Sequence, residues 1–179
     1  NPEQIRKDLA FFGQFGKKGV GYYVAELKES IGGILGLDNH WNVAIIGMGH
    51  LGAALANYQG IARLGFRLAA IFDANPVVIG TRVGERRVED IAYLAEIIAE
   101  RDIQIGVIAV PAAHAQGVAD QLVAAGIRGI WNFAPVKLQV PPSIPFVSED
   151  LSVGLSALSY YLTHASAEDG ELSDKNLTD

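Results

Sequence analysis

A glycine-rich motif followed by a distant carboxylate is the part of this sequence with the clearest chemistry. The motif has the pattern G-x-G-x-x-G and consists of Gly47, Met48, Gly49, His50, Leu51 and Gly52. The first glycine permits a tight turn, the second lets the backbone approach a pyrophosphate, and the third lets a helix pack on a strand. Asp73 follows about 20 residues later, where its carboxylate can accept hydrogen bonds from both ribose hydroxyls. The spacing predicts a dinucleotide site, and Asp73 favours NAD(H) because it repels the 2′-phosphate of NADP(H).

Two later loops complete the predicted site. Each follows an apolar run, and ligands bind at the carboxyl ends of strands in parallel sheets. We expect the loops to contribute Val110, Pro111, Asn132, Phe133 and Ala134. Their apolar character suits a nicotinamide ring. The same glycine turn also occurs in domains that bind CoA or no nucleotide, and Arg82 could soften the preference against a 2′-phosphate.

The sequence contains few residues that could catalyse hydride transfer to or from a dinucleotide. A dehydrogenase needs a proton donor or acceptor beside the nicotinamide, usually His, Lys or Tyr. Of the four histidines, only His114 is near a suitable loop, and there we expect an exposed or structural side chain. No substrate domain follows the nucleotide-binding region, and no metal-ligand cluster is evident. We therefore expect a protein that binds the dinucleotide and has no catalytic residue.

Strands and helices alternate from residue 38 to residue 150. Apolar runs predict strands at 41–46, 68–73, 105–110 and 127–133. Helical patterns occupy 54–64, 89–102 and 111–126. This alternation predicts an α/β fold with a Rossmann-like, doubly wound parallel sheet.

The regions outside the sheet differ from it in character. Residues 1–37 predict a helix that ends at Gly13, a hairpin over 14–23 and a short helix from residue 24. An apolar helix follows over 151–165, and the polar tail 166–179 is expected to be disordered. The basic residues Arg6, Lys7, Lys17 and Lys18 concentrate in the first segment.

Composition restricts the class of protein. The chain has 179 residues, half of them hydrophobic, a net charge of −6 and no cysteine. The negative charge argues against a surface that coats nucleic acid everywhere, so any such contact must be local. The absence of cysteine excludes disulfides and thiolate metal sites and suits the cytoplasm. No apolar run reaches the length of a membrane span.

Five motifs in a fixed order resemble the Rex family of redox-sensing transcriptional repressors. They are RKDLAFFGQFGKKGVGY, VAIIGMGHLGAALANY, AVPAAHAQ, GIWNFAPV and EDLSVGLSALSYYL. The resemblance runs from residue 1 to about residue 164. It implies that residues 1–37 are the end of a winged helix-turn-helix that lacks its first two helices, and that this chain is truncated.

The resemblance also implies partners and roles. The first helix would be the recognition helix and the hairpin its wing, so we expect DNA contacts from Gln4, Arg6, Lys7, Lys17 and Lys18. The helix at 151–165 would be exchanged between the protomers of a homodimer. Asp150 is similar in position to an acidic residue that contacts the DNA-binding domain in the family. Leu151 of the partner subunit would help Phe133 to form a pocket for the neutral dihydronicotinamide.

The function that follows is a cytoplasmic NADH/NAD⁺ sensor that binds operator double-stranded DNA as a dimer and is released by NADH. Two alternatives remain open on the residues. One is a small NAD-dependent oxidoreductase that uses His114, and the other is a CoA-binding Rossmann domain.

Overall fold

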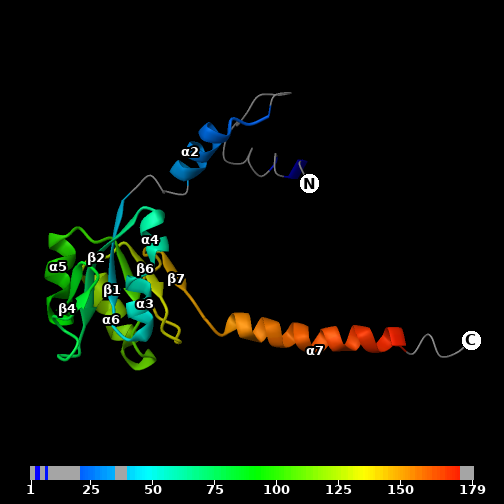
Figure 1. The fold of residues 1–179 in the computed structure, drawn as a ribbon. Helices are drawn as coiled ribbons and strands as arrows, with labels where there is room; N and C mark the ends of the chain where they lie inside the picture. Colours follow the sequence, from blue (N-terminus) through cyan, green and yellow to red (C-terminus); the bar gives the residue numbers. More distant parts are fainter. Residues whose placement is uncertain (1–2, 5–6, 8–20, 35–39, 174–179) are drawn as a thin grey trace, which may run out of the picture.

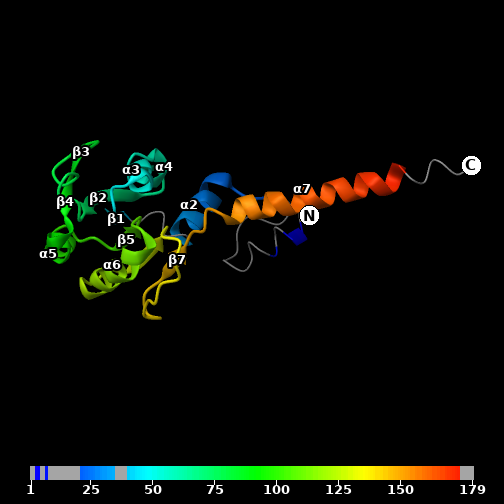
Figure 2. The ribbon, with the colours of Figure 1, turned by 90° about the horizontal axis from the view of Figure 1, so that it is seen from below.

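A seven-stranded sheet forms the centre of the protein. The computed structural model describes residues 3–4, 7, 21–34 and 40–173. The strands lie in the order β3-β4-β2-β1-β5-β6-β7, and every neighbouring pair is parallel except the β3-β4 hairpin. Figures 1 and 2 together label all seven strands. Their bounds are β1 Trp41–Ile46, β2 Phe66–Asp73, β3 Arg82–Val83, β4 Arg86–Asp90, β5 Ile105–Ile108, β6 Gly129–Asn132 and β7 Phe146–Ser148. The predicted parallel, Rossmann-like sheet is confirmed.

Helices cover both faces of the sheet. The helices around it are α3 His50–Ala56, α4 Gln59–Arg63, the 3-10 helix η1 Ile91–Tyr93, α5 Leu94–Glu100 and α6 Ala112–Ala124. In β1, Ala44 and Ile46 pack under α5 and α6, whereas Val43 and Ile45 face α3. Successive side chains of a strand point to opposite faces, so a strand covered on both faces is apolar throughout. This explains the unbroken apolar run that identified β1.

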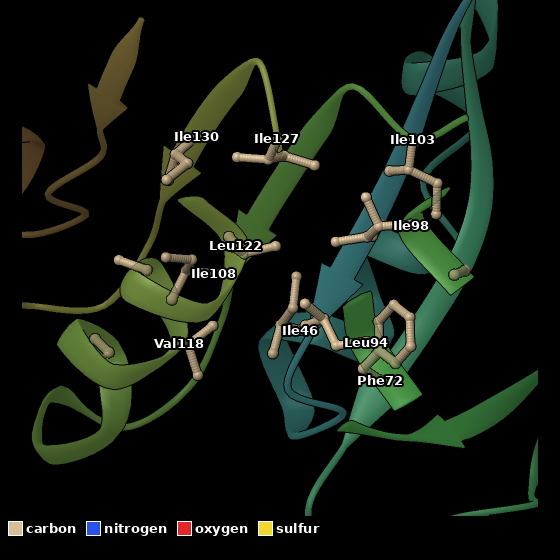
Figure 3. Packing of buried hydrophobic residues seen from close by; sticks show 14 of the residues in the cluster. Ile46, Phe72, Leu94, Ile98, Ile103, Ile108, Val118, Leu122, Ile127 and Ile130 are labelled. Atoms are coloured by element: carbon tan, nitrogen blue, oxygen red, sulfur yellow. The ribbon is translucent and has the colours of Figure 1, made fainter. Parts of the chain in front are cut away.

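The larger core lies between the sheet and the pair α5 and α6. Figure 3 shows side chains from strands and helices directed into this layer. Ile46, Phe72, Ile108 and Leu122 are each 0% exposed. Full burial of a side chain of this size stabilises the fold by about 1.5–3 kcal/mol. The core therefore fixes the strands whose carboxyl ends carry the glycine motif.

The opposite face is only partly covered. Its cluster contains buried Val43, Ile45 and Val107, and the helical residues packed there come from α3. Trp131 and Phe133 of the β6 region complete the cluster and are only half-buried. Within the described residues, α3 is the one helix that contributes side chains to this cluster, through Leu55 and Ala56.

One local prediction was wrong, and two short strands were missed. Glu89 and Asp90 belong to β4 instead of a helix, because Val88 pairs with Ile71 of β2 and the Asp90 carboxylate caps η1 by accepting from the Ala92 amide. The hairpin partner β3 and the short strand β7 were not predicted.

The helix expected over 54–64 is interrupted. α3 ends with Asn57 as its C-cap, and α4 begins after Tyr58. The Asn57 side-chain amide donates to Ala53 O at 2.8 Å, while the Tyr58 ring lies against Gly60. These local contacts stabilise a turn at a position where the sequence pattern predicts that the helix continues.

Two helices lie outside the sheet region. α2, Val24–Ile34, confirms the short helix expected from residue 24, and Glu3, Gln4 and Lys7 are helical as predicted. α7, Val153–Ser173, extends away from the sheet in both views (Figures 1 and 2). It continues past residue 165, so residues 166–173 are helical where a disordered tail was expected. No described helix is long and apolar enough to cross a membrane.

Candidate functional site

A cleft lies at the carboxyl ends of β1, β2 and β5. This is the point where the strand order reverses on either side of β1, the usual ligand position in such sheets. The cleft has a volume of about 580 Å³. It is lined by Ile46, Gly47, Met48, Gly49, Asp73, Ala74, Asn75, Val78, Ile91, Ala109, Val110, Pro111, Ala113, His114, Gly117, Val118 and Gln121.

The three glycines of the motif serve three different structural needs. Gly47 has a φ of +99°, and a Cβ atom there would lie 2.6 Å from Ala109 O. A Cβ atom at Gly52 would collide with Gly47 O, so this glycine lets α3 approach the turn. A Cβ atom at Gly49 would have no neighbour within 4 Å. The space beside Gly49 is open for a group that approaches the backbone closely.

The start of α3 is suited to an anion. Gly49 is its N-cap and provides no side-chain hydrogen bond to the first turn. The first amides of a helix have no intrahelical acceptor, and they carry partial positive charge. An anionic group beside Gly49 can therefore take the place of a capping side chain.

Asp73 connects the turn to the second strand. One carboxylate oxygen accepts from the Met48 amide at 2.6 Å, and the other accepts from the Asn75 amide at 2.8 Å. A carboxylate has about four acceptor positions, so each oxygen can still receive a hydroxyl. The side chain is half-buried at the end of β2. Asp73 thus holds the glycine loop in place and remains able to bind a diol.

The remaining wall of the cleft comes from segments that the sequence interpretation did not assign to the site. His114, Gly117, Val118 and Gln121 of α6 line it together. Their spacing of three or four residues places them on one face of the helix. That helical spacing after a strand-end loop is the signal that could have identified them. His114 is exposed, as expected, and its imidazole lies on this wall.

Six of the predicted ligand contacts do not line the cleft in the single chain. They are His50, Leu51, Gly52, Asn132, Phe133 and Ala134. His50 is exposed, and Gly52 acts through the packing described above.

Asn132 has a structural role besides the predicted ligand contact. It is 0% exposed, and its side-chain amide donates to Ala134 O, Val136 O and Ser148 Oγ at 3.0, 3.2 and 3.1 Å. Its side-chain oxygen accepts from the Ala134 amide at 3.0 Å. These bonds fix the orientation of the side chain, so Asn132 shapes the loop after β6, and its contact with the ligand stays a prediction.

Phe133 lies on the other side of that loop, next to the partly covered face. Its ring is 4.5 Å from the Trp131 ring, centroid to centroid. The Trp131 indole N–H donates to Glu149 Oε1 at 3.3 Å. The two rings thus form a half-buried aromatic surface.

Asp150 forms the entrance to α7. One carboxylate oxygen accepts from the Ser152 hydroxyl at 2.6 Å and from the Ser152 amide at 2.9 Å. These two hydrogen bonds hold the pKa of the Asp150 carboxyl below its ordinary value. The carboxylate therefore prefers its charged form while it holds the turn that precedes α7.

The described residues hold no group of three or more His, Asp or Glu side chains that could bind a metal ion. Of the DNA contacts expected, Gln4 and Lys7 are exposed on helical backbone. Arg6, Lys17 and Lys18 lie outside the described residues.

Comparison with known proteins gives two kinds of match. Residues 38–136 match the family model of the CoA binding domain. The chain is 48% identical over 161 residues to a redox-sensing transcriptional repressor Rex of Clostridium perfringens, which covers 90% of this chain and 76% of that protein. A Rex of Chloroflexus aurantiacus is 48% identical over 159 residues, covering 89% of this chain and 75% of the relative.

Solved structures agree with these relatives. A crystal structure of RSP in complex with β-NAD⁺ and operator DNA has a TM-score of 0.88 and 41% identity, and the match covers 100% of this chain and 81% of that one. A crystal structure of RSP in complex with β-NADH has a TM-score of 0.84 and 40% identity, covering 94% and 78%.

Proposed function

The chain belongs to the Rex family of redox-sensing transcriptional repressors, and residues 38–136 belong to the CoA binding domain family; on that premise we propose how this chain senses NADH. The protein is an NADH/NAD⁺-responsive repressor that binds operator DNA and is released from it by NADH. The observation that carries the proposal is the cleft itself, in which a glycine turn and Asp73 are joined by the hydrogen bond from the Met48 amide.

The residues present fit a nicotinamide dinucleotide. The open space at Gly49 and the first turn of α3 would hold the pyrophosphate, and Asp73 would hold the adenosine ribose. Val110 and Pro111 would contact the ligand from the loop after β5. The ligand supplies a ring that is positively charged when oxidised and neutral when reduced. His50 and Leu51 belong to the same loop and are proposed as backbone contacts.

Discrimination between the two redox states needs an apolar surface. Burying a positively charged ring without a partner is costly, whereas a neutral ring is accepted. We assign this surface to Phe133, with Ala134 as its buried support and Leu151 of the partner subunit opposite. Phe133 is half-buried in the single chain, and Leu151 is 66% exposed, so both have area left to cover.

We expect a second copy of the chain to cover the exposed helix α7. Along the described side chains of α7, large apolar residues are 59–72% exposed. The face around Trp131 and Phe133 is only partly covered: α3 contributes Leu55 and Ala56 to its cluster, and the two aromatic rings stay half-buried. An apolar helix and a partly covered apolar face on identical chains favour a symmetric dimer in which each α7 packs on the other subunit.

NADH can act on DNA only through a difference in affinity between two arrangements of this dimer. Gln4, Arg6, Lys7, Lys17 and Lys18 are the residues proposed to contact the operator, and the cytoplasm is the proposed location. No residue of the cleft pairs with His114 as a donor and acceptor couple would, so the protein is proposed to bind NADH without turnover.

The test is calorimetric titration of the full chain with NADH and then with NAD⁺ in the same buffer. Much tighter binding of NADH without consumption of the nucleotide supports the sensor. Equal affinities, or oxidation of NADH in the presence of hydroxy acids or aldehydes, would contradict it. Phe133→Ala should reduce the NADH to NAD⁺ affinity ratio, and His114→Ala is the matched cleft variant that should leave the ratio unchanged.

CoA is the second candidate, and the family match over residues 38–136 is the observation that favours it. Asp73 opposes it because a carboxylate at the ribose position repels a phosphate on that sugar. A competition titration decides between them. Displacement of NADH by micromolar CoA would favour a CoA site, and no displacement would leave NAD(H) as the ligand.

A further inference from the structure

A second cavity lies at the opposite end of the sheet from the nucleotide cleft. It has a volume of about 270 Å³ and is lined by Asn42, Arg67, Ala69, Arg86 and Arg101. Asn42, Arg67 and Arg86 stand at the amino ends of β1, β2 and β4, and Arg101 ends α5. Three arginines therefore surround one cavity in a chain whose net charge is −6.

Nearby carboxylates balance only part of the positive charge in this cavity. Glu89 accepts from both terminal nitrogens of Arg101, at 2.5 and 3.2 Å. This bidentate pair balances the charge of Arg101. Within the described residues, no acidic side chain lies within ion-pair distance of Arg67 or Arg86. Two of the arginines that line the cavity, Arg67 and Arg86, thus have no compensating carboxylate among the described residues.

The walls of the cavity are held in place by other contacts. Asn42 donates from its side-chain amide to Arg101 O and Asp102 O, both at 3.0 Å. Arg101 also donates to Ala69 O at 3.0 Å. A basic residue at the end of α5 is explained by the partial negative charge of a helix carboxyl terminus, and Arg101 alone meets that need. The other two arginines need a different explanation.

We propose that this arginine cavity binds small molecules that carry a phosphate or diphosphate group. Guanidinium groups pair with phosphate through two parallel hydrogen bonds, and several of them around one cavity suit an anion with more than one negative charge. A concave site of this size suits a small anion better than a DNA duplex, which needs an extended surface. The site is separate from the dinucleotide cleft, since it lies at the other ends of the same strands.

The test uses inorganic pyrophosphate as the probe and the full chain saturated with NADH, so that the glycine loop is already occupied. Calorimetric titration is done at constant ionic strength and without divalent cations. Arg67→Gln and Arg86→Gln should each weaken pyrophosphate binding by at least about tenfold, because each removes a charge-assisted hydrogen bond. Binding by the unmodified chain and loss in both variants would support the site.

Arg87→Gln is the matched control. Arg87 is the next residue in β4, is exposed, donates to Gly80 O at 2.9 Å and does not line the cavity. An equal loss in this variant, or no heat of binding in the unmodified chain, would overturn the proposal. NADH affinity should be the same in all three variants. A chain that failed to bind NADH would contradict the redox sensor, while the comparison of the three variants would still test the arginine cavity.

Discussion

The apolar residues of α6 and those of α7 are similar in type and opposite in environment. Leu122 in α6 is 0% exposed against the sheet, whereas Leu158 in α7 is 59% exposed. In α6 the buried residues occupy one face, and in α7 the apolar residues occur nearly all round the helix. The comparison shows that an apolar helix is not buried by its own composition. It is buried only where a surface of matching shape covers it, and among the described residues no such surface covers α7.

The largest expected effect comes from truncating one buried side chain in α6 and one exposed side chain in α7. Leu122→Ala should lower the free energy of unfolding by about 2–5 kcal/mol, because it leaves a cavity in the core. Leu158→Ala should change it by less than about 0.5 kcal/mol in dilute protein, where the helix is uncovered. Urea unfolding at low and high protein concentration measures both. Equal losses at low concentration would show that α7 packs on its own chain.

A charge on α7 tests whether a second copy covers it. Leu158→Asp should weaken dimer association by about 100-fold or more, because an unpaired carboxylate would be buried at the interface. Val77→Asp is the matched control, since Val77 is 82% exposed on a loop outside α7. Analytical ultracentrifugation gives the dissociation constants. A dimer that is unaffected by Leu158→Asp would remove α7 from the interface.

Two glycines of the loop are expected to differ in role, because Gly52 is needed for packing and Gly49 for the approach of the ligand. Gly52→Ala should destabilise the fold by about 1–3 kcal/mol, because its Cβ atom would collide with Gly47 O. Gly49→Ala should leave thermal unfolding nearly unchanged while it weakens NADH binding, because the added methyl group enters open space that the ligand needs. Calorimetry of unfolding and of binding separates the two effects, and similar stability losses in both variants would contradict the assignment.

The smallest effect concerns the pH dependence of the α7 entrance. Hydrogen bonds from Ser152 lower the pKa of Asp150 below its ordinary value of 3.8. The charged carboxylate is therefore the form that the folded entrance prefers, and its contribution is present above pH 3.8 and is lost as the pH falls through the lowered pKa. Helicity measured by circular dichroism should fall slightly in that range. Asp150→Asn should abolish this pH dependence, and an unchanged profile would assign it elsewhere.

The sequence predicts the centre of the fold better than its margins. β1 and the position of Asp73 follow directly from the unbroken apolar runs and the fingerprint spacing. The β3-β4 hairpin was missed because Glu89 and Asp90 precede an apolar helical pattern and resemble a helix start. The pairing of Val88 with Ile71 makes this segment a strand. That contact joins residues that are distant in the sequence, so a local sequence pattern does not reveal it.

The candidate site shows the same division. Backbone-determined parts, such as Gly47 and Gly52, were predicted correctly in their structural roles. Side-chain direction in a loop has no periodicity, so the sequence does not predict the hydrogen bonds that Asn132 makes within the loop after β6. His114 and Gln121 line the cleft because α6 packs against β5. The sequence alone does not show that packing.

The single strand β1 connects the arginine cavity with the nucleotide cleft. It begins at Trp41, beside Asn42 of that cavity, and ends at Ile46, next to the glycine loop. Six residues of strand span about 20 Å. Val43 to Ile46 are at most 3% exposed, and β1 is paired on both sides. A close-packed strand of this kind leaves little room for rearrangement between its ends, so the glycine loop and the arginine cavity stand at a fixed separation.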